Sequence, residues 1–298
     1  MINAPEFSSL EELENSNWLR DITEKFKNEE WPVECKRCQD TESINNKSIR
    51  LNSIEFHNLQ TKPDYLIVGG VLDNLCNSAC QTCSPMVSTK IASLYGEIIR
   101  IRNIDNFWKL PQDRIVHLDI NGGEPSYSPD YKEILRNLPP NVASIRLNTN
   151  CSTVLDELID IANKGIDVTV TVSFDGVSLV HEYLRWPIKW DNFLDNLMKY
   201  KSMPINLNLW TTVSALNIGD LKNIILFAKQ NGFNHSWALL EQPNVLSVKH
   251  INFLTKNADV PEELKHIVAS GNNNDSELLE YINRQDKLRK IDMKDYLK

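Results

Sequence analysis

Residues Leu72–Pro85, LDNLCNSACQTCSP, place Cys76, Cys80 and Cys83 in a C-x3-C-x2-C pattern directly after an apolar run. A [4Fe–4S] cluster normally takes four cysteine ligands, so a loop with three thiolates leaves one iron open to a ligand that is not protein. The pattern therefore indicates an iron–sulfur cluster with one reactive iron.

From Asp64 onward, short apolar, β-branched runs alternate with helical patterns. The predicted strands are Tyr65–Val71, Ile115–Ile120, Ser144–Leu147, Val168–Phe174, Ile205–Val213 and His235–Leu240. The predicted helices between them are Thr89–Ile101, Asp130–Leu138, Val154–Lys164, Trp190–Tyr200 and Asp220–Asn231. This alternation implies parallel strands with right-handed crossovers, in either a barrel-like or a doubly wound sheet.

Polar turns follow several of these strands, at the edge where parallel barrels build their sites. Gly122-Gly123-Glu124-Pro125 suits a bound amino acid, because glycines permit close approach and a carboxylate can accept a ligand ammonium. In SFDG, Ser173 and Asp175 can bond ribose hydroxyls, and Arg185, twelve residues after Ser173, offers a fork of donors to a carboxylate. An ordinary turn is the alternative for each, Asn148 included.

The cysteine loop together with GGEP resembles the radical S-adenosylmethionine (radical SAM) superfamily, over roughly Asp64 to Leu254. The SFDG turn, followed by Arg185 twelve residues after Ser173, resembles the maturase-like branch of this superfamily, which is related to the SPASM and twitch proteins. The resemblance implies an α/β fold, a partial (β/α)6 TIM-type barrel. It also implies a [4Fe–4S] cluster on Cys76, Cys80 and Cys83, which reductively cleaves S-adenosylmethionine to a 5′-deoxyadenosyl radical that abstracts hydrogen from a substrate.

The same resemblance implies roles for individual residues. The GGE turn would hold the methionine amine, Ser173 the ribose and Arg185 the methionine carboxylate, with Asn148 and Asp175 as further candidates. Thr82 stands where an aromatic residue commonly lies against the adenine, so it would stack less. The substrate implied is a peptide or protein side chain, with small-metabolite and nucleoside chemistry as alternatives, and the electron donor a flavodoxin or ferredoxin.

A structural zinc site is the main alternative for the cysteines, with Cys35-x2-Cys38 and Cys80-x2-Cys83 as two knuckles around one ion. The chain would then be a non-catalytic zinc- or iron–sulfur-binding structural or interaction protein. That arrangement leaves Cys76 without a role. Cys35 and Cys38 could also supply half of a second cluster, but nothing after Cys151 is a cysteine, so we expect them to hold no cluster.

The pattern divides the chain into an N-terminal extension (1–60), a radical SAM core (61–254) and a C-terminal helical tail (255–298). In the extension, Ser8 or Ser9 can cap a helix, Asn17–Glu30 has helical spacing, and TESINNKS (41–48) reads as a loop. In the tail, Pro261–Ser270 and Ser276–Lys290 are predicted as surface helices.

The net charge of −8, with 32 scattered basic residues among 298, disfavours a broad nucleic-acid surface. No segment approaches the ~18 uninterrupted apolar residues of a membrane span, so we expect a cytoplasmic protein with no membrane partner. The six cysteines suit metal ligation in a reducing compartment more than disulfides. His117 is expected in the core or at the surface, and Trp186, Trp190 and Trp210 in packing.

Overall fold

The computed structural model describes residues 5–45, 48, 50, 51, 54, 65–248, 260, 262, 264, 265 and 275–297. The chain divides into two compact units, Met1–Tyr65 and Leu66–Lys298. The three segments predicted from the sequence, 1–60, 61–254 and 255–298, remain a prediction.

The first unit is helical where it is described. Its elements are α1 (Leu10–Glu14), α2 (Asn17–Lys27), the 3-10 helix η1 (Val33–Cys35) and α3 (Lys36–Asn45). Ser9 and Ser16 cap α1 and α2, each accepting a hydrogen bond from a backbone N–H three residues on. The predicted helices are confirmed, but the loop predicted over 41–48 is wrong as far as Asn45, because α3 continues through it.

The second unit is built on a parallel sheet whose strands follow one another in chain order, β1-β2-β3-β4-β5-β6. The strands are β1 (Leu66–Asp73), β2 (Ile115–Gly122), β3 (Ser144–Thr149), β4 (Asp167–Ser173), β5 (Asn206–Val213) and β6 (Asn234–Leu239). All pairings between neighbours are parallel. In the described ranges the six predicted strands are thus confirmed, as is the partial TIM-type barrel.

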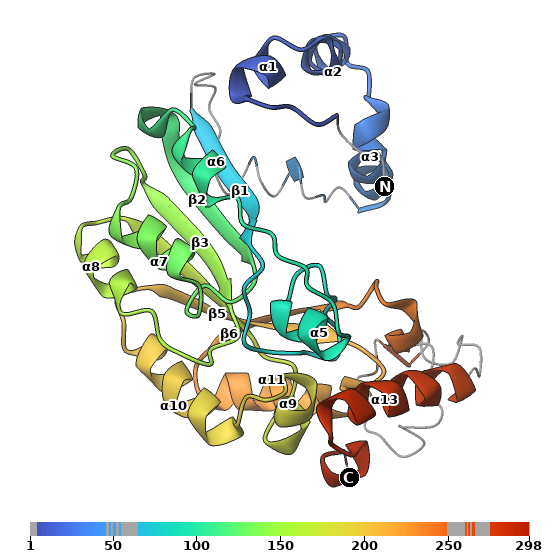
Figure 1. The fold of residues 1–298 in the computed structure, drawn as a ribbon. Helices are drawn as coiled ribbons and strands as arrows, with labels where there is room; N and C mark the ends of the chain where they lie inside the picture. Colours follow the sequence, from blue (N-terminus) through green and yellow to red (C-terminus); the bar gives the residue numbers. More distant parts are fainter. Residues whose placement is uncertain are drawn as a thin grey trace. The chain divides into compact units, whose positions relative to one another are not determined.

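Helices connect the strands and cover the outer face of the sheet, as α7, α8, α10 and α11 do in Figure 1. The helices are α5 (Thr89–Leu94), α6 (Ile104–Trp108), α7 (Pro129–Arg136), α8 (Glu157–Asn163), α9 (Leu179–Leu184), α10 (Trp190–Lys201), α11 (Leu221–Gln230) and α13 (Asp275–Arg289). The short 3-10 turns are η2 (Gln112–Arg114), η3 (Ile218–Asp220), η4 (Asn244–Leu246) and η6 (Met293–Asp295).

The two faces of the sheet differ in chemistry. Leu147, Val170 and Val172 are buried in the core, where Phe193 and Leu197 of α10 also lie. Successive side chains of a strand point to opposite faces, so the residues between these aliphatic ones turn the other way. Apart from Trp210, those residues are polar: the register sets Asp119 opposite Arg146, Asn148 opposite Thr171, and Ser173 opposite Trp210. The inner face therefore differs from the apolar filling of a closed barrel.

The helix predicted over Thr89–Ile101 is wrong beyond Leu94. Tyr95 ends α5, and Gly96 adopts a φ of 74°, the left-handed conformation that favours glycine. The chain then runs back along the cysteine loop, where Ile101 N–H donates to the Asn74 side chain (2.9 Å) and Ile99 C=O accepts from it (3.1 Å). Hydrogen bonds with the loop therefore outweigh the helical spacing of Ile98 and Ile101.

Helix α13 confirms the helix predicted over Ser276–Lys290, but its description as a surface helix is wrong. Leu278 and Ile282 are buried in a second hydrophobic cluster with Tyr183, Val213 and Leu246. The helix predicted over Pro261–Ser270 lies mostly outside the described residues.

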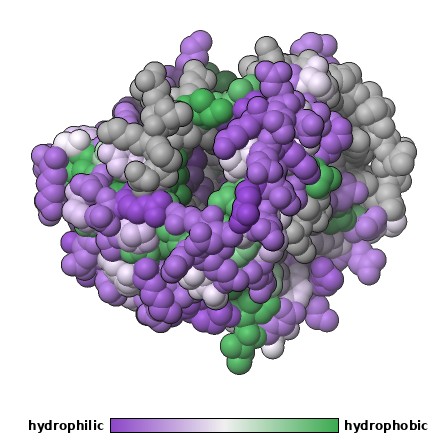
Figure 2. All heavy atoms as spheres, turned by 90° about the horizontal axis from the view of Figure 1, so that it is seen from above, coloured by the Kyte–Doolittle hydropathy of each residue, from purple (hydrophilic) through white to green (hydrophobic). Residues whose placement is uncertain are grey.

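Within the described ranges, no helix is both long and apolar enough to cross a membrane. In the view of Figure 2 hydrophilic residues predominate, with hydrophobic ones in scattered patches.

Candidate functional site

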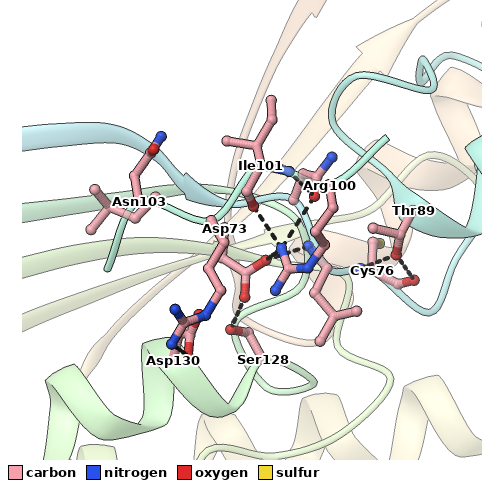
Figure 3. A network of polar contacts seen from close by, with 12 residues as sticks. Asp73, Cys76, Thr89, Arg100, Ile101, Asn103, Ser128 and Asp130 are labelled. Atoms are coloured by element: carbon pink, nitrogen blue, oxygen red, sulfur yellow. Dashed lines mark hydrogen bonds and ion pairs between the residues drawn. The ribbon is translucent and has the colours of Figure 1, made fainter. Parts of the chain in front are cut away.

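The cysteine loop leaves β1 at Asp73, which is fully buried and anchors its start (Figure 3). The Asp73 carboxylate accepts a hydrogen bond from Leu75 N–H at 2.6 Å and from the Ser128 hydroxyl, and it pairs with Arg100. A buried carboxylate is stable only when it is paired and hydrogen-bonded, and this one meets both conditions. The carboxylate thus connects the loop to the N-terminus of α7, through Ser128, and to the segment that follows α5, through Arg100.

The GGEP turn at the end of β2 lies against the backbone of the cysteine loop. Gly123 N–H donates to Asp73 C=O at 2.9 Å, and Glu124 N–H donates to Leu75 C=O at 2.8 Å. A Cβ atom on Gly123 would lie 2.2 Å from the Leu75 carbonyl oxygen, and Gly122 has a φ of 121°. Both positions therefore require glycine, so that the turn can approach the loop that carries the cysteines.

The other side of the loop is held by the last residue of α9 and the residues that follow it. Ala79 N–H donates to Trp186 C=O at 2.8 Å, and Gln81 N–H donates to Leu184 C=O at 2.9 Å. Cys76 N–H donates to the Thr89 hydroxyl at 3.1 Å. The loop is thus held by backbone hydrogen bonds on both flanks.

Cys76, Cys80 and Cys83 are free thiols, and Cys80 is only 6% exposed. Burial raises the pKa of Cys76 far above its ordinary value, and a negative charge on Cys80 adds to the rise. Burial and Cys80 likewise raise the pKa of Cys83. Burial and the neighbouring thiols thus disfavour the thiolate form of Cys76 and Cys83, and a bound cationic centre would favour it. Among the described residues, no group of three or more Cys, His, Asp or Glu is placed to hold a metal ion.

Arg185, the residue after α9, brings a cation to the loop. Its Nη2 pairs with the Asp175 carboxylate at 2.6 Å, and its Nη1 lies 3.6 Å from Cys80 Sγ. Burial disfavours this cation, but Asp175 and Cys80 outweigh burial and raise the pKa of Arg185 above its ordinary value. Its Nε is buried and has no hydrogen-bond partner in the described part of the chain. Asp175 also accepts from Thr212 N–H at 2.9 Å.

Glu124 is 1% exposed, and its carboxylate is bonded to the chain itself. It accepts hydrogen bonds from Ser126 N–H (3.0 Å) and hydroxyl (2.6 Å), the Thr149 hydroxyl (2.7 Å) and Asn150 N–H (2.6 Å). Burial raises the pKa of Glu124, while these hydrogen bonds oppose the rise. The carboxylate therefore joins the ends of β2 and β3 beside the loop.

Ser173 and Asn148 open onto a cavity of about 350 Å³ on the inner face of the sheet. The cavity is lined by Asp119, Asn121, Arg146, Asn148, Thr171, Ser173 and Trp210. Asp119 pairs with Arg146 on its wall. Trp210, predicted to pack, is 38% exposed and lines the cavity, so that prediction is wrong for this residue.

Three further residues named in the sequence analysis, Trp190, His117 and Thr82, are also described by the structure. Trp190 packs against Phe174 and Phe193, as expected. His117 is buried with Nδ1 2.7 Å from the Ser144 hydroxyl, which confirms a core histidine. Thr82 lies half-buried within the cysteine loop.

Cys35 and Cys38 lie in the first unit, at the end of η1 and in the first turn of α3. Both are free thiols. Burial raises the pKa of Cys35, and Cys38 adds to the rise. That they hold no cluster stays a prediction.

Helix α13 adds contacts to the cysteine loop that the sequence did not predict. Arg289 Nε donates to Ala79 C=O at 2.9 Å, and the Tyr281 hydroxyl donates to Gln81 C=O at 2.9 Å. About 200 residues separate donor and acceptor in each pair, so no local spacing could have shown them.

No protein-family model and no curated protein sequence matches the chain. Among solved structures it is similar to Streptococcus suis SuiB bound to S-adenosylmethionine, with 15% identity and a TM-score of 0.48, over 91% of this chain and 60% of SuiB. It is also similar to anSMEcpe with bound AdoMet, with 14% identity and a TM-score of 0.47, over 70% of this chain and 68% of that one. A third is TsrM from Kitasatospora setae, a radical S-adenosylmethionine methyltransferase with cobalamin and a [4Fe–4S] cluster bound, with 13% identity and a TM-score of 0.41, over 58% of this chain and 34% of TsrM.

Proposed function

We propose that the chain is a radical SAM enzyme. The observation that carries the proposal is the loop of three free thiols, Cys76, Cys80 and Cys83, held by the GGEP turn at the carboxyl edge of an open parallel barrel. When bound, a [4Fe–4S] cluster and S-adenosylmethionine would supply a 5′-deoxyadenosyl radical that abstracts hydrogen from a substrate C–H bond.

The donor set suits such a cluster. Three thiolates can ligate three irons and leave the fourth open, as the cysteine spacing requires. The thiols are also flanked by the guanidinium of Arg185, which can offset the negative charge of thiolates in a low-dielectric site. A buried, cation-flanked loop is thus suited to anionic sulfur ligands.

The residues around the loop divide between binding and positioning S-adenosylmethionine. The buried Nε of Arg185 is a donor without a partner in the described chain, which suits the methionine carboxylate. The GGE turn would take the methionine amine, with one charge-assisted hydrogen bond to the Glu124 carboxylate. The bonds of that carboxylate to the Thr149 hydroxyl and Asn150 N–H also set the shape of the turn. Ser173 and Asn148 line the cavity and would meet the ribose, with Thr82 near the adenine.

We assign the substrate to peptide or protein side chains, on the resemblance of SFDG and Arg185 to the maturase-like branch. The amide, hydroxyl and charged groups of Asn121, Thr171 and Arg146 along the cavity suit a polar substrate of that kind. A flavodoxin or ferredoxin would supply the electron. A small metabolite or nucleoside is the second candidate.

The reaction can be tested without knowing the substrate. Chain loaded with iron and sulfide under nitrogen, then given dithionite and S-adenosylmethionine, is expected to form 5′-deoxyadenosine and methionine. Dithionite supplies the electron, the C5′–sulfur bond breaks, and the radical takes a hydrogen atom from solvent components or buffer. Chromatography measures both products, with the Cys80→Ala chain as the blank. A loaded chain that forms no more product than this blank would refute the proposal.

A further inference from the structure

The last residue of α13, Arg289, reaches into the backbone of the cysteine loop. Its Nε donates to Ala79 C=O at 2.9 Å and its Nη2 to Cys80 C=O at 3.3 Å. Its Nη1 donates to Gln285 Oε1 at 2.7 Å, one turn earlier in the helix. The residue is 4% exposed, so this guanidinium is buried against the segment that carries the thiols.

All three hydrogen-bond partners of Arg289 are neutral. Within the described part of the chain no carboxylate forms an ion pair with it, in contrast to Arg185, whose charge is balanced by Asp175 at 2.6 Å. Asp286 is near enough to interact electrostatically with Arg289, but its carboxylate accepts hydrogen bonds from the Tyr183 hydroxyl and from Met293 N–H. A buried cation without a bonded anion is costly.

The position of Arg289 indicates which anion would balance its charge. The Nη2 of Arg289 lies 3.3 Å from the carbonyl oxygen of Cys80, so the buried guanidinium lies against a residue that carries one of the sulfur ligands. The sulfur ligands of the loop are therefore the natural counter-charge of this guanidinium.

We propose that Arg289 acts as the counter-charge of the cysteine loop and raises the reduction potential of the cluster that the loop would hold, an inference that rests on the proposed function. One-electron reduction adds a negative charge to the site, and a fixed cation in a low-dielectric environment favours that change. Arg185 contributes less per charge, because the Asp175 carboxylate already balances part of its charge.

The contact is built into the fold. On the same helix, the Tyr281 hydroxyl donates to Gln81 C=O at 2.9 Å, and Gln285 donates to the Tyr95 hydroxyl. Leu278 and Ile282 bury the face of α13 beneath these residues. The helix therefore holds Arg289 rigidly enough for its charge to act at a constant position.

The test is a redox titration of the loaded chain with dithionite under nitrogen, followed by electron paramagnetic resonance and without S-adenosylmethionine. Arg289→Gln should move the reduction equilibrium at least about tenfold toward the oxidised cluster, about 59 mV for a one-electron couple. Lys287→Gln removes the same charge from an exposed position of α13 and should move it less than about twofold, because water and salt screen that charge. Arg289→Lys, which keeps the charge, should fall nearer the native chain than Arg289→Gln.

Two further variants separate charge from structure. Tyr281→Phe removes a neutral hydrogen bond to the loop and should leave the equilibrium unchanged. Asp286→Asn removes a nearby negative charge from a side chain of the same shape and should move the equilibrium toward the reduced cluster. If Arg289→Gln does not keep its iron, Asp286→Asn becomes the deciding variant. An Asp286→Asn chain whose cluster has an unchanged reduction potential would overturn the inference.

The failures are distinguishable. A native chain with no reducible cluster would refute the proposed function and this inference with it. A native chain with a reducible cluster, together with equal shifts in Arg289→Gln and Lys287→Gln, would refute the role of Arg289 alone.

Discussion

Replacing Cys76 by Ala is expected to reduce the iron content from about four per chain to less than about one, because a cluster held by three thiolates loses a third of its protein ligands. Absorption near 400 nm and iron analysis after anaerobic loading measure the loss. Cys76 lies in the loop between the Thr89 hydroxyl and Ser78, whose N–H donates to Cys76 Sγ at 3.5 Å. Alanine keeps the backbone hydrogen bond to Thr89, so the loop itself should persist.

The matched control is the Cys35→Ala, Cys38→Ala double variant, which removes two thiols of the first unit. It should keep all of the native iron. Loss of about half would show a second cluster, since two clusters would hold about eight irons. Metal retained in Cys76→Ala would instead support the zinc arrangement, in which Cys76 has no part.

Glu124→Ala is expected to weaken the binding of S-adenosylmethionine roughly tenfold to a hundredfold while the iron stays bound, since one charge-assisted hydrogen bond is worth about 1.5 to 3 kcal/mol. The structure adds a second effect. Removal of the carboxylate leaves Asn150 N–H and Ser126 N–H buried without their acceptor, at a cost of about 1 to 3 kcal/mol for each. The free energy of unfolding should therefore fall by about 2 to 6 kcal/mol.

Denaturant unfolding and equilibrium dialysis of S-adenosylmethionine measure the two effects separately. Glu133→Ala, which removes an exposed carboxylate from the same βα unit, serves as the control and should change neither. Unchanged affinity for S-adenosylmethionine in Glu124→Ala would remove Glu124 from the binding site. An unchanged free energy of unfolding would contradict the inference that the Glu124 carboxylate joins the ends of β2 and β3.

The strands could be predicted because runs such as Val168–Phe174 carry their signal in adjacent residues. The cysteine loop was visible for the same reason, as its three thiols lie within eight residues. The requirement for glycine at Gly122 and Gly123 was also visible, but its cause was not: both glycines contact the backbone of the cysteine loop. That cause needed the three-dimensional structure.

Features that depend on distant partners could not be predicted. The end of α5 is determined by hydrogen bonds between Asn74 and the 99–101 segment, which outweigh the helical spacing. The burial of Asp175 follows from its pairing with Arg185, and the burial of Arg289 from its contacts with Ala79 and Cys80. Nothing in the local sequence of a charged residue reveals such a partner.

The most direct test of the central claim, that Cys76, Cys80 and Cys83 hold a [4Fe–4S] cluster, is metal analysis of the native chain prepared without oxygen. We predict a brown protein with about four irons per chain, as iron–sulfur ligation by this loop requires, and without stoichiometric zinc. A colourless protein with one zinc and no iron per chain would contradict the account.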